Sequence, residues 1–95
     1  MKPTKEELAL QVDMAEWSWL RAHLERGGLI VVAPELELAE VGERIARDDT
    51  ATVGAWIEAG KLSKPSDGQI ATWDADKVAR FSTLIISPYV LMKEQ

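Results

Sequence analysis

Apolar residues recur at intervals of three and four in three stretches of the chain, which is the spacing of one face of a helix. They are Trp17, Leu20 and Leu24, then Leu38, Val41 and Ile45, and then Val53, Trp56 and Ile57. Gly27-Gly28 closes the first predicted helix, and the second spans about residues 36–47. The third follows Asp48 and Asp49, which stand where an N-cap belongs, and stops at Gly60.

Pairs of polar residues three apart, of the kind that cap a helix start, add further boundaries. They are Thr4 with Glu7, Asp13 with Glu16, and Ser66 with Gln69. The first pair predicts a short helix with Leu8 and Val12 on its apolar side. The second predicts a break near Asp13 and the start of the Trp17 helix. The third predicts a short helix that buries Ile70 and Trp73.

Two continuous apolar runs predict strands. "LIVVA", residues 29–33, is rich in β-branched side chains and stops at Pro34, as expected of a strand buried on both faces. "TLIISPYVLM", residues 83–92, is the second run. Its Ser-Pro pair lacks the glycine or asparagine of tight hairpin turns, so we expect one bent strand with a bulge at Pro88 rather than a hairpin.

These elements predict an α+β fold in a single domain, residues 1–95, with four or five short helices packed on a small two- or three-stranded sheet. The 29–33 and 83–92 segments supply the sheet, and "KLSKP" is a connector or a short edge strand. So few strands leave open edges and are marginal in water. We therefore predict a homodimer that joins strands or buries aromatic side chains across a two-fold axis.

Composition and charge narrow the function classes. The chain is 46% apolar and 28% charged, the balance of an ordinary globular protein, and no run is long enough to cross a membrane. No signal segment opens it and cysteine is absent, so we expect a cytoplasmic protein without disulfides. The net charge of -5 and the scattered basic residues oppose nucleic-acid binding, which depends on lysines and arginines displacing phosphate counterions.

Residues 36–62 resemble the helix-turn-helix unit of excisionase and MerR-type regulators. The matching scaffold residues are Val41, Ile45, Val53, Trp56, Ile57, Gly60 and Leu62. The positions expected to face outward on the second helix, among them Thr50, Ala51, Ala55 and Glu58, cannot read base edges bidentately. We interpret the unit as a packed helical hairpin, with a DNA-associated regulator acting through a more basic partner as the alternative.

Other candidate chemistry has ordinary structural explanations. The acidic 35–49 segment places Glu40 and Glu43 four residues before Arg44 and Arg47, which is how an exposed helix face balances its charge. His23 lies one helical turn from Trp19, and no nucleophile motif accompanies it. The pair Asp74 and Asp76 has the spacing of a capped turn, and the glycines match no phosphate loop. We predict no catalytic residue, no metal and no cofactor.

Four tryptophans are many for so short a chain. Trp17, Trp56 and Trp73 fall on apolar stripes and are predicted to be core residues. Trp19 points away from Trp17 on the same helix. We therefore predict Trp19 and Tyr89 as interface residues, because partly wet aromatic side chains are enriched where proteins meet.

From end to end the chain resembles a family of small bacterial proteins, domain of unknown function 2288. The resemblance rests on Trp17, Leu20 and Gly27, on "VVAPELELAEV", "DD" and "AWIEAGKL", and on Trp73 and "PYVLM". It implies a single bacterial cytosolic domain and carries no activity or site residue. Our hypothesis is a non-enzymatic protein-interaction domain. It binds either a second copy of itself or a different partner protein. A small-molecule binder, which needs an apolar pocket with a few convergent polar groups, is a further possibility.

Overall fold

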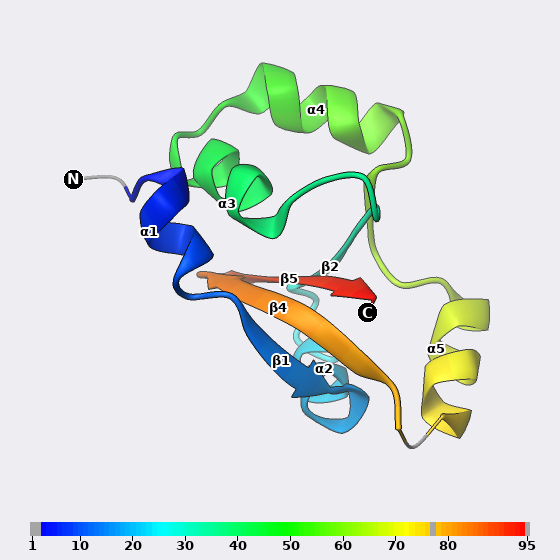
Figure 1. The fold of residues 1–95 in the computed structure, drawn as a ribbon. Helices are drawn as coiled ribbons and strands as arrows, with labels where there is room; N and C mark the ends of the chain where they lie inside the picture. Colours follow the sequence, from blue (N-terminus) through cyan, green and yellow to red (C-terminus); the bar gives the residue numbers. More distant parts are fainter. Residues whose placement is uncertain (1–2, 77, 95) are drawn as a thin grey trace.

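In the computed structural model, which describes residues 3–76 and 78–94, a five-stranded sheet lies between two layers of helices (Figure 1). The strands are β1 (Asp13–Glu16), β2 (Leu29–Val32), β3 (Leu62–Ser63), β4 (Arg80–Ile86) and β5 (Tyr89–Glu94). Their order in the sheet is β1-β4-β5-β2-β3. The β2–β5 pair is parallel and the other neighbours are antiparallel, so β1 and β3 are the two edges.

Helices cover both faces of this sheet, and each face has its own core. The helices are α1 (Lys5–Ala9), α2 (Trp17–Leu24), α3 (Leu38–Ala46), α4 (Thr50–Glu58) and α5 (Asp67–Ala75). Residues of α1 and α3 are buried against Leu84 and Leu91 on one face, with α4 packed partly against them. Residues of α2 and α5 are buried against Phe81 and Met92 on the other. Successive side chains of β4 and β5 therefore point alternately into the two cores. This alternation is expected of a strand that is buried on both faces of a sheet.

Several boundary predictions are confirmed. Gly27 and Gly60 have φ of 79° and 76°, the left-handed conformation that ends α2 and α4. The Ser66 hydroxyl accepts from the Gln69 N–H and the Gln69 side chain accepts from the Ser66 N–H, so the capping box at α5 is complete. The α+β class is also confirmed. Among the described residues, no helix is long and apolar enough to cross a membrane.

The prediction of one bent strand over residues 83–92 is wrong. β4 and β5 pair antiparallel from Ile86–Tyr89 to Phe81–Glu94, so the segment is a hairpin. Ser87 and Pro88 form its turn, and the peptide bond between them is cis. This turn therefore closes the hairpin without a glycine or asparagine at positive φ.

The predicted count of two or three strands is also wrong, because one predicted run is the two strands β4 and β5 and because β1 escapes prediction. Asp13–Glu16 pairs with β4 as an edge strand instead of opening a helix, and α2 begins at Trp17 without a side-chain cap. Only Ala15 within β1 is partly buried, so no apolar alternation marks the strand in the sequence. Val12, predicted to face inward, is exposed. The suggested short edge strand in "KLSKP" is present as β3.

Candidate functional site

The two predicted interface residues, Trp19 and Tyr89, are both exposed but lie in different parts of the surface. Trp19 projects from α2 with its ring 4.5 Å from that of His23, centroid to centroid. Tyr89 begins β5 beside the hairpin turn. Their side chains are 43% and 40% accessible. Each lines a different hollow, so they mark two candidate surfaces rather than one.

The first surface surrounds the edge strand β1 and gathers most of the large exposed apolar side chains of the described residues. We call it the β1 patch; its members are Leu10, Val12, Met14, Trp19 and Ile85. Leu10 and Val12 lie in the segment that enters β1, and Met14 lies within it. Trp19 from α2 and Ile85 from β4 line, with Met14, a hollow of about 540 Å³. The register pairs Met14 with Ser82, so the Met14 side chain lies on the sheet face opposite to that of Ile85 and borders the hollow at the open edge of β1. The exposed apolar side chains thus surround the edge strand on both of its faces.

Hydrogen bonds already occupy part of the β1 backbone. The Met14 N–H donates to the Asp13 side chain at 2.8 Å, and the Thr83 hydroxyl donates to the Asp13 carbonyl at 3.1 Å. Arg80 lies 3.2 Å from the Glu16 carboxylate and offsets its charge. Such charged, self-satisfied edges resist the addition of another strand. The β1 patch is therefore better suited to side-chain packing than to extension of the sheet.

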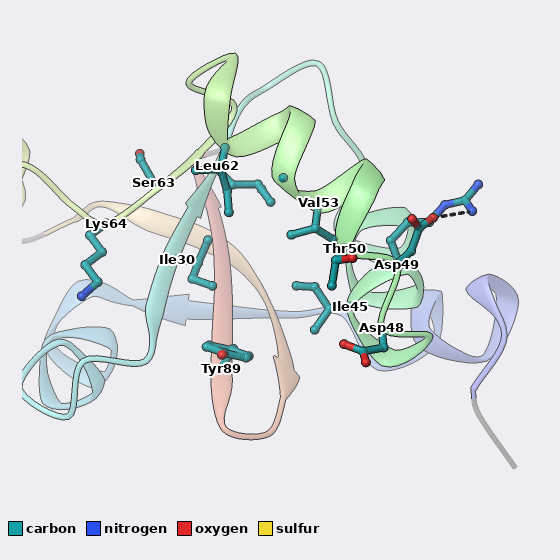
Figure 2. Close-up of a pocket in the computed structure, with 13 residues that line it drawn as sticks. Ile30, Ile45, Asp48, Asp49, Thr50, Val53, Leu62, Ser63, Lys64 and Tyr89 are labelled. Atoms are coloured by element: carbon teal, nitrogen blue, oxygen red, sulfur yellow. Dashed lines mark hydrogen bonds and ion pairs between the residues drawn. The ribbon is translucent and has the colours of Figure 1, made fainter.

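The second surface is a cleft of about 590 Å³ between α4 and the sheet, which we call the α4 cleft (Figure 2). Its apolar lining consists of Ile30, Ile45, Val53, Ile57, Leu62 and Tyr89. α3 sits close to the sheet, because a Cβ on its Gly42 would come within 2.7 Å of Leu84 Cδ2. α4 has no fully buried residue and stands off the sheet. Ile57, predicted to face the core, is consequently 58% exposed.

Charged groups occupy the ends of the α4 cleft. Asp49 caps α4 by accepting from the Thr52 N–H at 3.1 Å and the Thr52 hydroxyl at 2.9 Å, and its carboxylate lies 3.2 Å from Arg44. Asp48, at φ 59°, and Lys64 have no side-chain hydrogen bond or ion pair within the described part of the chain. Figure 2 shows Asp48 and Ile45 toward one end, Lys64 at the other and Tyr89 between them.

The capping role of Asp49 predicts a stability that depends on pH. The Thr52 N–H, then its hydroxyl, and Arg44 hold the pKa of Asp49 below its usual range. A carboxyl whose pKa is lowered by folding stabilises the protein above its unfolded pKa, about 3.9, and loses that contribution as pH falls through the folded value. Asp49→Asn keeps a capping side chain but no charge. We therefore expect the stability difference between wild type and Asp49→Asn to shrink on acidification.

Urea unfolding of both proteins near neutral pH and at about pH 3 measures this difference. Asp67→Asn is the matched control, because it removes a carboxylate from the first turn of α5 where Ser66, not Asp67, caps the helix. It should show a smaller change with pH. A difference for Asp49→Asn that stays constant or widens in acid would contradict the role assigned to its carboxylate.

The other candidate groups serve separate structural purposes. The Trp17 indole N–H donates to Asp74 at 2.7 Å, whereas Asp76 accepts from the Val78 N–H at 3.1 Å, so the two carboxylates do not form an acid and base pair. Trp17 and Trp73 are buried as predicted, and Trp56 is partly buried. Among the described residues, no three histidine or acidic side chains gather in a group that could hold a metal ion.

The acidic 35–49 segment balances its charge through α1 as well as α3. The predicted Glu43–Arg47 pair is present at 3.6 Å. Arg44 pairs with Asp49 instead of Glu40, and Glu40 lies 4.0 Å from Lys5. Lys5 is also 3.3 Å from Glu37, whose hydrogen bond and charge raise the pKa of the Lys5 amine. These carboxylates are engaged in fastening α1 to α3.

The helix-turn-helix resemblance covers α3 and α4, which contact each other as a helical pair. The exposed positions of α4 carry short, apolar or acidic side chains: Thr50, Ala51, Ala55, Ile57 and Glu58. None is a basic or amide side chain that could read guanine or adenine. The structure therefore provides no base-reading surface on α4.

Comparison with known proteins supports the end-to-end resemblance. The family model described as "Protein of unknown function (DUF2288)" matches residues 3–94. Among solved structures, the NMR solution structure of PA1075 from Pseudomonas aeruginosa is similar, with 29% sequence identity and a TM-score of 0.80. The match covers 93% of this chain and 81% of the other. No curated protein matches the chain.

Proposed function

The chain therefore belongs to the DUF2288 family, and we propose that it is a non-enzymatic protein-interaction domain in which the β1 patch joins two copies. One observation supports this above the others. Five of the eight large apolar side chains that are exposed among the described residues lie in or around β1. Large exposed apolar side chains gathered around one element mark interaction sites on soluble proteins.

A second copy fits the β1 patch because the patch offers both a projecting group and a hollow. In a two-fold dimer the same surface meets itself, so any projection must find its complement on the same patch. Trp19 projects at the rim of the hollow that Met14 and Ile85 also line. Trp19 of each copy would then pack over Met14 and Ile85 of the other. Large aromatic anchors in such positions contribute most of the binding energy of an interface.

Because of the protein's charge, added salt should strengthen the proposed dimerisation, whereas it weakens binding to DNA. Each copy carries a net charge of -5, so two copies repel at long range. Added salt screens that repulsion and should strengthen a dimer held by apolar contacts. Association with DNA weakens steeply with salt because counterions must be displaced. The sign of the salt dependence therefore separates self-association from the alternative of a DNA-associated regulator.

Sedimentation equilibrium at micromolar concentrations, in low and high salt, tests the proposal. We expect a monomer–dimer equilibrium that salt shifts toward dimer. Trp19→Ala should weaken dimerisation by roughly 30-fold, the effect of removing an interface anchor worth about 2 kcal/mol. Ile57→Ala, an exposed apolar side chain of α4, is the matched control and should leave the equilibrium unchanged.

Two results would overturn the proposal: a wild-type protein that stays monomeric throughout, or a Trp19→Ala variant that dimerises as tightly as wild type. Circular dichroism of Trp19→Ala should match wild type. If it does not, Met14→Ser, on the other side of the same hollow, is used in its place and is subject to the same criterion.

A further inference from the structure

We propose that the α4 cleft binds a small amphipathic organic cation, with its apolar body between α4 and the sheet and its amine beside Asp48. This site is distinct from the β1 patch and does not depend on self-association. Its volume of about 590 Å³ lies within the range of roughly 300–1,000 Å³ found for small-molecule sites. Mostly apolar walls with a few polar groups at the ends are also characteristic of such sites.

The apolar walls lie on two sides, the sheet strands β2 and β5 on one and α4 on the other. Ile30 from β2 and Tyr89 from β5 form the sheet side of the α4 cleft, and Val53 and Ile57 form the helix side (Figure 2). α4 is held in this position at its ends. At its start Asp49 lies 3.2 Å from Arg44 of α3, and beyond its finish the Lys61 carbonyl accepts from the Ala33 N–H at 2.9 Å. The opening is therefore a consequence of how α4 is anchored.

Charge selects a cation over an anion. The Arg44 guanidinium is already paired with Asp49 at 3.2 Å, whereas the Asp48 carboxylate has no side-chain partner among the described residues. Lys64, at the far end, is exposed as Asp48 is and likewise has no side-chain partner among the described residues, so the selection rests on the charge of the whole protein rather than on the lining alone. The net charge of -5 adds a long-range attraction for cations.

Tyr89 supplies a second group suited to an amine. Its ring is 40% exposed and lies between Asp48 and Lys64 in the view of Figure 2. An aromatic face attracts a quaternary or protonated amine, and a carboxylate nearby strengthens that attraction. A chain of several methylenes attached to the amine would reach Ile30, Val53 and Ile57.

The backbone at Asp48 allows an unusually clean test of its charge. Asp48 has φ of 59°, and asparagine tolerates this left-handed conformation at least as well as aspartate. Asp48→Asn therefore removes the charge with little change in shape or stability. Lys64→Gln is the matched control, because it removes the opposite charge at the other end of the same cleft.

The experiment is an NMR titration with three probes that share one chain length: octyltrimethylammonium, octanoate and octanol. We expect saturable binding of octyltrimethylammonium, with shifts at Ile30, Ile57 and Tyr89, and much weaker binding of octanoate. Asp48→Asn should weaken binding of the cation by about ten-fold, a typical effect of removing a charged partner. Lys64→Gln should leave it unchanged or slightly tighter.

The proposal fails if octanoate binds as tightly as the cation, if Asp48→Asn binds like wild type, or if the shifts gather at Trp19 and Ile85. It also fails if no probe gives saturable shifts. Repeating the titration with Trp19→Ala separates the two sites. Loss of dimerisation with retained cation binding is the result that both proposals predict for this variant. Unchanged dimerisation with retained cation binding would refute the β1 patch and keep the α4 cleft, and loss of both would refute the separation of the two sites.

Discussion

Phe81→Ala is expected to lower the free energy of unfolding by about 3–5 kcal/mol, the range for emptying a buried aromatic position. Phe81 is 1% exposed and packs against two indole rings that also contact each other. Its ring centroid lies 5.1 Å from that of Trp73 and 6.1 Å from that of Trp17, and those two are 4.9 Å apart. This cluster fastens α2 and α5 to one face of the sheet, so its loss affects two helices together.

Such a loss is large for a chain of 95 residues, since domains of this size have about 5–10 kcal/mol of stability in total. Urea unfolding followed by tryptophan fluorescence measures it. Ile85→Ala, on the same strand and the same face but 53% exposed, is the matched control and should have a much smaller effect. If Phe81→Ala cost no more than Ile85→Ala, the aromatic cluster would not be a core.

Gly28→Ala is expected to destabilise the protein by about 1–3 kcal/mol, the usual effect of overpacking. A Cβ at this position would lie 2.6 Å from the Pro88 carbonyl oxygen. That oxygen belongs to the backbone of the hairpin turn and cannot rotate away as a side chain could. The Val90 N–H also donates to the Gly28 carbonyl at 2.8 Å, where the parallel β2–β5 pair begins. Relief of the clash must therefore disturb the pairing of the two central strands.

Gly54→Ala provides a control of opposite sign for the same chemical change. Gly54 lies within α4 and a Cβ there would meet nothing within 4 Å. Alanine should stabilise this helix by about 0.5–1 kcal/mol. Thermal unfolding of the two variants side by side should place them on opposite sides of wild type. A Gly28→Ala variant as stable as wild type would mean that the hairpin turn does not approach β2 as closely as described.

Elements with strong local signals could be predicted from the sequence, and elements defined by their neighbours could not. The run at residues 29–33 and the Ser66–Gln69 pair specify their structures through adjacent residues alone. β1 is exposed at an edge, and its partner β4 is about 65 residues away, so nothing within Asp13–Glu16 shows that it is a strand. β3 has two residues and depends likewise on β2.

The candidate surfaces were predictable only in part, for a related reason. Trp19 could be proposed because it lies off the apolar stripe of its helix, and Tyr89 because partly wet aromatic side chains are enriched where proteins meet. Met14 and Ile85 join Trp19 only through the β1–β4 pairing, which the sequence did not show. Ile57 lies on a regular apolar stripe, and a stripe alone does not say whether the helix packs tightly or stands off the sheet. The α4 cleft exists because α4 stands off the sheet.

Isotope-filtered nuclear Overhauser spectroscopy on a mixture of labelled and unlabelled copies tests the central claim most directly, because it detects contacts between molecules only. We expect contacts from the Trp19 indole protons of one copy to the Met14 and Ile85 methyl groups of the other, with none from Ile57. The absence of intermolecular contacts at concentrations where sedimentation shows dimer, or contacts confined to α4 and β3, would contradict the assignment of the β1 patch as the interface.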